Sequence, residues 1–336
     1  MSLAGIGVVA RQEFRLRIRT GRWRWLLGAW LLVVTGFTGL LYAGLQHTTR
    51  TDDGAVMYGG LMLFVLALAA LVAPALAAQS VNGDRERGVL AALQVTALGA
   101  GDIATGKLVA AWGTSVVFLA LTLPDVLWCV AAGGVQLTRL LVTMGVMVLL
   151  LGVICAIALA LSALLRRTTT SGLLSYLAVF ALSIGTLVVF GLVSAATQET
   201  RVVHTPVDPN CSIDPGFSPG GCSGTYTESV VRTDRTWWLL APNPFLILAD
   251  SAPQTAKQKR GSSTDPLGSM ARWVRDQRRG PTSSFTYGSL SSTRNPGAVW
   301  PWGLGFDVLL GAGGLWLTTR RLRTPTRKLA RGARIA

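Results

Sequence analysis

The amino-acid sequence predicts an all-α membrane protein with six transmembrane helices and a large extracellular insertion between the fifth and sixth. Half of the 336 residues are hydrophobic and only 14% are charged, whereas a soluble domain carries about 25% charged residues. Mean hydropathy is +0.46. These values indicate that lipid surrounds much of the chain.

Six apolar runs are long enough to form the membrane-spanning helices, because a helix needs about 20 residues to cross a hydrocarbon core about 30 Å thick. Only the third and the sixth contain an acid. They are Trp25 to Leu45, Val56 to Ala78, Leu108 to Ala132, Leu140 to Leu165, Leu173 to Ala195 and Ala298 to Thr318. We therefore expect helices one to five within 25–195 and helix six at 298–319.

The distribution of Lys and Arg predicts the orientation, because basic residues beside a span resist translocation. Six arginines lie in the basic N-terminal segment 1–24 and seven basic residues in the tail 320–336. The short loops on that side carry Arg85, Arg87, Lys107, Arg166 and Arg167, and those on the other side carry only Arg50 and Arg139. Both termini are expected in the cytosol, and the net charge of +15 is explained by topology and anionic lipid without nucleic acid.

The segment 196–297 is the main polar part of the chain and is expected outside the cell. Cys211 and Cys222 lie there, on the side where thiols oxidise, and we expect them to form a disulfide. The apolar stretch 237–249 is too short to span and is broken by Pro242 and Pro244, so we expect it to dip into the outer interface. If it crossed instead, everything downstream would change sides.

Two acids within spans are candidates for the translocation path or a subunit interface, because acids are costly in lipid. Asp125 lies about 27 Å along the third span from Lys107, near the outer surface and just after a kink expected at Pro124. The alternative to a functional role there is that its side chain simply reaches water. Asp307 lies closer to mid-membrane. Its side chain is expected either to line the path or interface or to form a structural hydrogen bond with a neighbouring helix.

Residues that would form a catalytic or metal site are not clustered. The two histidines, His47 and His204, fall in separate loops. The stretch from Gly101 to Lys107 has the glycine and lysine spacing of a phosphate-binding loop, but Leu108 stands where Ser or Thr must hold magnesium. We therefore expect no cofactor and no catalysis on this chain.

The connection 79–107 is the most informative cytosolic segment. Asp84, Arg85, Glu86 and Arg87 place both charges beside the membrane, and Leu90 and Leu93 lie three residues apart on one helical face. Such a surface suits docking into a partner's groove; the alternative is a solvated loop. Upstream, Gly5 to Arg19 is expected to form an interfacial helix, although apolar residues alternating with arginines also fit a strand.

This segment resembles the permease subunits of ABC-2 type transporters. Glu86-Arg87-Gly88, Leu90, Leu93 and Gly106-Lys107 occur in the family's order and spacing, and Asn243-Pro244-Phe245 stands before the last span as in many of its members. The sequence departs from the pattern at three positions. Val89 and Ala91 stand where Thr and Glu are common, and Ala97 stands where Pro is common.

The resemblance implies the membrane subunit of an ABC exporter in a bacterial plasma membrane. A separate ATPase, in two copies, would hold ATP and magnesium, and a second permease subunit, identical or homologous, would complete the path. The residues expected to couple to the ATPase are Asp84, Arg85, Glu86, Arg87, Gly88, Leu90 and Leu93. Two alternatives remain from the sequence: a membrane-bound sensor or assembly factor, and a lipid-modifying membrane enzyme.

Overall fold

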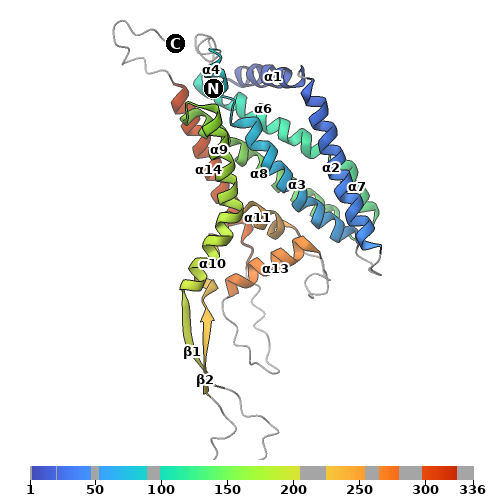
Figure 1. Ribbon diagram of the computed structural model, residues 1–336, viewed down its shortest axis with the longest axis vertical. Helices are drawn as coiled ribbons and strands as arrows, with labels where there is room; N and C mark the ends of the chain where they lie inside the picture. Colours follow the sequence, from blue (N-terminus) through green and yellow to red (C-terminus); the bar gives the residue numbers. More distant parts are fainter. Residues whose placement is uncertain are drawn as a thin grey trace, which may run out of the picture.

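The computed structural model describes residues 2–19, 21–46, 53–88, 99–204, 225–253, 265–279 and 297–323. Within them the chain is mostly helical (Figure 1). The helices of the first half are α1 (Leu3–Arg19), α2 (Arg22–Leu45), α3 (Asp53–Ala77), α4 (Asn82–Glu86), α6 (Ala100–Ala120), α7 (Leu123–Ala131) and α8 (Leu137–Leu164). Those of the second half are α9 (Thr168–Phe180), the π-helix η1 (Ala181–Gly185), α10 (Thr186–Ala196), η2 (Thr233–Arg235), η3 (Trp237–Leu239), α11 (Pro244–Ser251), α13 (Pro266–Arg279) and α14 (Trp300–Leu322).

Five helical segments of the described chain are long and apolar enough to cross a membrane, and they match the first five predicted spans. They are Trp23–Leu45, Gly54–Glu86, Ala100–Ala131, Leu137–Leu164 and Thr168–Ala196. The sixth predicted span is α14, which has 23 residues but is less apolar. Its crossing of the membrane stays a prediction.

Glycines hold α14 close to α8. A Cβ atom on Gly314 would lie 3.1 Å from the carbonyl oxygen of Ala156, and one on Gly311 would lie 3.4 Å from the Cα atom of Val153. Small residues of this kind let two helix backbones approach closely within a membrane. The sixth predicted helix is thus part of the same bundle as the other five.

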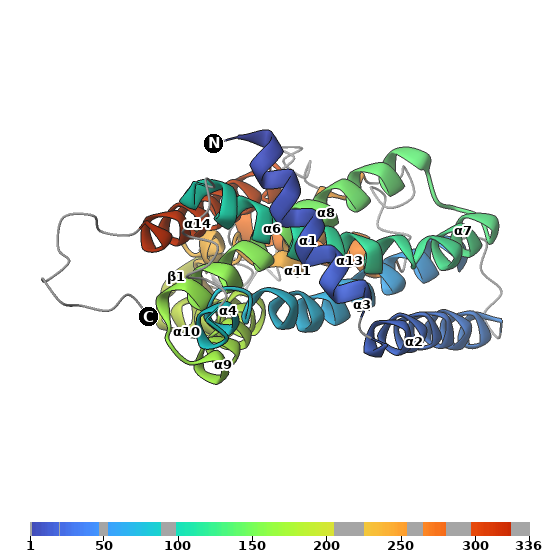
Figure 2. The ribbon, with the colours of Figure 1, turned by 90° about the horizontal axis from the view of Figure 1, so that it is seen from above.

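The bundle has a buried centre and an exposed rim. Helices α3 and α8 are mostly buried, whereas α2 and the α9 to α10 segment are mostly exposed. Figure 2 shows α2 at the edge of the molecule. The exposed apolar side chains on these helices, such as Leu32, Leu40, Leu177 and Leu192, are suited to contact lipid or another membrane subunit.

The third predicted span is broken near its outer end, where α6 ends at Ala120 and Pro124 stands in the first turn of α7. This confirms the expected kink at Pro124. At its other end α6 begins at Ala100, where the Asp102 carboxylate accepts a hydrogen bond from the backbone N–H of Gly99 at 3.2 Å. Lys107 therefore lies about two turns inside α6, and Gly101 to Lys107 form helix rather than a phosphate-binding loop.

The segment from Gly5 to Arg19, for which the sequence allowed a helix or a strand, forms a helix, α1. Helix α1 lies across the end of the bundle that also carries α4 and the last turn of α14 (Figure 1).

At the opposite end of the bundle, the strands β1 (Gln198–His204) and β2 (Thr225–Val231) form an antiparallel pair that continues from α10. Cys211 and Cys222 lie outside the described residues, so their disulfide stays a prediction.

The stretch 237–249 forms η3 and most of α11. With eight residues, α11 is about 12 Å long, which is too short to cross the hydrocarbon core. Most of its residues are buried. Asn243 caps it by accepting hydrogen bonds from the backbone N–H groups of Phe245 at 3.0 Å and Leu246 at 3.3 Å. The Asn243 amide also donates to the carbonyl oxygen of Ser183 in η1, which ties α11 to the fifth span.

Two further polar contacts attach the segment between α10 and α14 to the bundle. Arg139, which the sequence places in a short outer loop, is fully buried and forms an ion pair with Asp265 just before α13. Asp250, at the end of α11, accepts hydrogen bonds from the backbone N–H groups of Val299 at 2.6 Å and Trp300 at 2.8 Å. A carboxylate at a helix N-terminus is favourable, so Asp250 fixes the start of α14.

Candidate functional site

The predicted coupling segment lies where α1, α4 and α6 meet. Gly106 permits this meeting, because a Cβ atom at that position would lie 2.6 Å from the Cβ atom of Val9 and 3.1 Å from the carbonyl oxygen of Ile6. Only a glycine lets α1 approach α6 so closely. The glycine of the Gly106-Lys107 pair thus has a packing role.

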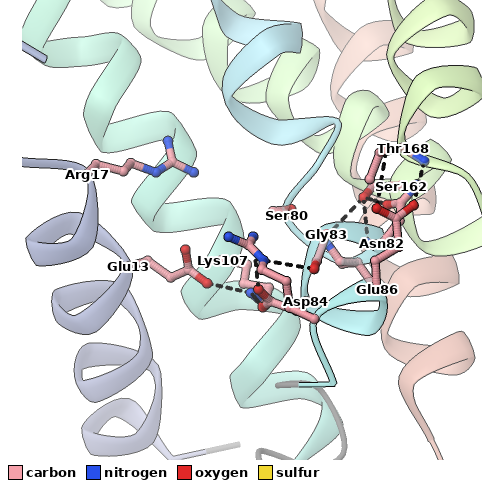
Figure 3. A network of polar contacts seen from close by, with 12 residues as sticks. Glu13, Arg17, Ser80, Asn82, Gly83, Asp84, Glu86, Lys107, Ser162 and Thr168 are labelled. Atoms are coloured by element: carbon pink, nitrogen blue, oxygen red, sulfur yellow. Dashed lines mark hydrogen bonds and ion pairs between the residues drawn. The ribbon is translucent and has the colours of Figure 1, made fainter. Parts of the chain in front are cut away.

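Lys107 connects all three helices. Its ammonium group bonds to the carboxylates of Glu13 on α1 and Asp84 on α4, and Figure 3 shows it between them. The Lys107 side chain is 0% exposed, and the two acids are 21% and 14% exposed. An ammonium group removed from water needs such partners, so α1 and α4 are both held by one residue of α6.

Arg17 makes a second connection between α1 and the spans. Its guanidinium donates to the carbonyl oxygen of Leu76 at 2.9 Å and to the hydroxyl oxygen of Thr114 at 3.4 Å. Burial lowers the pKa of Arg17 below its ordinary value, and the nearby Glu13 carboxylate opposes that shift. The last carbonyl groups of α3 have lost their helical partners, so Arg17 satisfies one of them.

On its other side, α4 is bonded to α8 and α9. The Ser162 hydroxyl oxygen accepts hydrogen bonds from the backbone N–H groups of Val81 at 3.1 Å and Asn82 at 3.3 Å. The Glu86 carboxylate accepts hydrogen bonds from Thr168, at 3.1 Å from its backbone N–H and 3.4 Å from its hydroxyl. Helix α4 is therefore a short connector that is bonded to α6, α8 and α9, and it is linked to α1 through Lys107.

The predicted coupling residues have different surroundings. Asp84 faces inward to Lys107, and Glu86 is exposed but bonds to Thr168 at the start of α9. Arg85 and Arg87 are exposed, and Gly88 ends the segment with a positive φ of 72°, a conformation that glycine adopts without strain. Leu90 and Leu93 lie outside the described residues.

Several residues of this junction were not identified from the sequence as members of a site. They are Glu13, Asn82, Ser162 and Thr168, whose partners are on other helices. Glu13 alone had a visible signal, since it is the one acid among the first 24 residues. An acid kept within a basic helix suggests a specific cationic partner.

The two acids within spans are both buried. The alternative that Asp125 reaches water is wrong, because the residue is 2% exposed and accepts a hydrogen bond from the Thr35 hydroxyl of α2 at 3.3 Å. Distance along a helix gives depth but not the neighbour that covers a side chain. Asp125 therefore makes a structural contact between the first and third spans.

Asp307 is also 2% exposed, and its Oδ1 atom has no hydrogen-bond partner among the described residues. It faces a cavity of about 10 Å³ whose lining comes from α8, α9, η1, α11 and α14. The lining includes Ile154, Leu182 and Pro244. The expected structural hydrogen bond is not observed at this oxygen, and Asp307 is not near the α1–α4–α6 junction.

No group of three or more His, Cys, Asp and Glu residues that could hold a metal ion is found in the part of the chain that the structure describes. The junction is instead a set of ion pairs and backbone contacts.

Comparison with known proteins identifies the family. The family model described as ABC-2 family transporter protein matches residues 8–208, which include most of α1, all of α4, Lys107 on α6 and the first five predicted spans. No curated protein matches the chain. Since the model covers more than half of the 336 residues, the chain belongs to the ABC-2 family of transporter proteins.

Proposed function

We propose that this chain is the membrane-spanning permease subunit of an ATP-driven ABC exporter and that it couples to a separate ATPase through α4 and the residues that follow it. A second permease subunit, identical or homologous, completes the translocation path. ATP and magnesium belong to the partner ATPase, which is present in two copies. Both termini lie in the cytosol of a bacterium, and the segment 196–297 lies outside.

The connection of α1 and α4 to Lys107 is the observation that supports this proposal most. A subunit that receives force from an ATPase needs a surface element rigidly joined to its spans. Helix α4 is that element, because an ion pair joins it to α6 and hydrogen bonds join its two ends to α8 and α9, while Lys107 of α6 also bonds to α1. A force applied at the exposed Arg85 and Arg87 reaches the third span through Asp84.

The geometry also suggests how the spans respond. Helix α6 is interrupted at Leu121–Thr122 and the fifth span is interrupted by the π-helix η1. Such interruptions are places where helices bend, and π-bulges occur often at functional sites. We expect the movement of α6 and α9 to open the path outward, between two copies of the six-span unit.

Charge reversal at Glu86 tests the docking role. Glu86→Lys is expected to leave the protein inserted in the membrane and to abolish the permease's stimulation of ATP hydrolysis, because it places a cation on the proposed contact face. Glu86→Gln is the matched control, since it keeps an acceptor for the hydrogen bonds from Thr168. Asp276→Lys, on the exposed face of α13, controls for charge reversal elsewhere.

The assay is ATP hydrolysis by the complex reconstituted in lipid. Loss of stimulation in Glu86→Lys with normal values for both controls supports the proposal. Normal stimulation in Glu86→Lys removes Glu86 from the docking surface. A well-folded chain that never associates with an ATPase would favour the sensor or assembly-factor alternative.

A further inference from the structure

A groove of about 460 Å³ lies between α1, the start of α2, the end of α3 and α4. This volume is within the range of about 300 to 1,000 Å³ typical of small-ligand sites. The groove is separate from the cavity at Asp307 and adjoins the ion pairs of the α1–α4–α6 junction. The proposed topology places it at the cytosolic face of the membrane.

One half of the groove is apolar and open to lipid. Leu16, Trp23, Leu26, Ala75 and Leu76 line it. Leu16 is 59% exposed and Leu26 is 44% exposed, so these side chains face the membrane when the protein is inserted. Trp23 lies at the start of the first span, where indole side chains mark the interface between lipid and water. This half suits an acyl chain.

The other half is polar. Gln79, Asp84 and Arg87 line it beside the Glu13 carboxylate. The Arg87 side chain is 70% exposed, and its Nη2 atom lies 3.6 Å from the Asp84 Oδ1 atom, which is too long for a hydrogen bond. The Arg87 Nε atom donates to the carbonyl oxygen of Gly83 at 2.9 Å, which leaves the terminal nitrogens of the guanidinium for a ligand while Asp84 stays bonded to Lys107.

The charges around the groove favour an anion. Both acids, Glu13 and Asp84, are bonded to the buried Lys107, and Arg17 and Arg87 add two more positive charges to the lining. The lining itself carries two basic and two acidic side chains, and the buried Lys107 behind it offsets the charge of the two acids, so the surroundings of the groove have an excess of one positive charge. A guanidinium group beside an excess positive charge is the preferred partner of a phosphate group.

We propose that this groove binds one anionic phospholipid of the cytosolic leaflet. The phosphate contacts Arg87, and an acyl chain lies along Leu16 and Leu26. A lipid in this position packs against both α1 and α4, and so supports the elements that Lys107 holds. The assignment of the leaflet rests on the topology of the proposed function, whereas binding itself does not require the ATPase.

Native mass spectrometry of the purified, delipidated chain tests the proposal. Phosphatidylglycerol and phosphatidylcholine are added separately, with soluble glycerol phosphate as the probe for a free anion. One phosphatidylglycerol per chain is expected, bound about tenfold more tightly than phosphatidylcholine. Both lipids carry the phosphate, but the choline cation of phosphatidylcholine cancels the charge of its head group and is repelled by the basic groups around the groove. Glycerol phosphate is expected not to bind, because it lacks the acyl chain.

Two pairs of variants address the two halves of the groove. Ala75→Trp fills the apolar half, and Leu71→Trp places the same side chain one turn earlier on the exposed face of α3, outside the lining. Arg87→Gln removes the phosphate contact, and Arg85→Gln removes a neighbouring exposed arginine that does not line the groove. Ala75→Trp and Arg87→Gln should each weaken phosphatidylglycerol binding about tenfold, and the two controls should bind as the original chain does.

Any of three results would overturn the proposal. The first is that phosphatidylglycerol and phosphatidylcholine bind equally tightly. The second is that Ala75→Trp and Arg87→Gln both bind phosphatidylglycerol as the original chain does. The third is that glycerol phosphate binds as tightly as phosphatidylglycerol. Size-exclusion chromatography and thermal unfolding establish which variants are folded. Ala75→Trp and Arg87→Gln change different halves of the groove, so one still tests the proposal if the other does not fold. A groove variant that loses the lipid but still forms the complex with the ATPase would show that lipid binding and ATPase coupling are separate properties.

Discussion

Lys107 on α6 forms a buried ion pair with Asp84 on α4. The same ammonium group bonds to Glu13 on α1, so one side chain of the third span holds the two helices that lie across the end of the bundle. A displacement of α4 must therefore move α6 or break the pair. This relationship is the basis of the first prediction.

Replacing Lys107 with Met should destabilise the protein by about 3 to 5 kcal/mol, because it leaves two partly buried carboxylates without their cation. The expected result is a lower midpoint of thermal unfolding in detergent and faster hydrogen exchange in α1 and α4. Arg85→Met is the matched control, since Arg85 is exposed on α4. If the two variants unfold at the same temperature, the ion pair does not hold the junction.

Gly106→Ala and Gly113→Ala should have opposite effects, although both glycines lie on α6. A Cβ atom at Gly113 would meet nothing within 4 Å, so alanine there should stabilise the helix by about 0.5 to 1 kcal/mol. At Gly106 the new Cβ would overlap Val9 and should cost about 1 to 3 kcal/mol. Thermal unfolding measures both. A stabilising Gly106→Ala would show that α1 does not pack against α6 as described.

Asn243→Asp should destabilise the protein even though Asp is as good a helix cap as Asn. The carboxylate still accepts from the backbone of α11, but it no longer donates to the carbonyl oxygen of Ser183 or to the Thr186 hydroxyl oxygen, 2.9 Å away. We expect a cost of about 1 to 3 kcal/mol from the unsatisfied carbonyl. Hydrogen exchange of α11 is the measurement, and protection equal to that of the original chain would exclude the contact with η1.

Asp307→Leu should preserve expression and change the free energy of unfolding by less than about 1 kcal/mol. The Oδ1 atom that it removes has no hydrogen-bond partner among the described residues, and an apolar side chain avoids burying an unpaired polar atom. Turnover of the reconstituted transporter should nevertheless fall. Val308→Leu, on an exposed position of α14, is the control. Normal turnover in Asp307→Leu would remove Asp307 from the translocation path.

The first five spans were predictable because an apolar run of about 20 residues needs no tertiary information to be found. Their places in the bundle were not. Helices α2 and α8 are both apolar along most of their length, yet α8 lies at the centre of the bundle and α2 at its edge. The sequence of one helix does not identify its neighbours, so this difference was not predictable. The same limit explains Asp125, because its distance along the third span gives no sign that Thr35 of α2 covers it.

The candidate site was predictable in part. The charged run 84–87 and the pair Gly106-Lys107 were visible as motifs. The ion pair was not, because Glu13 lies 94 residues and Asp84 lies 23 residues from Lys107 along the chain. Contacts of this length depend on how α1 folds back over α6, which follows from close packing at Gly106 rather than from any local pattern.

Co-purification of the tagged chain from its native membrane tests the central claim most directly. The account predicts that an ABC ATPase is recovered in stoichiometric amount, with two copies in each complex, and that the complex hydrolyses ATP in lipid. Reproducible recovery of the folded chain without an ATPase would contradict the assignment of this protein as the permease subunit of an ATP-driven transporter.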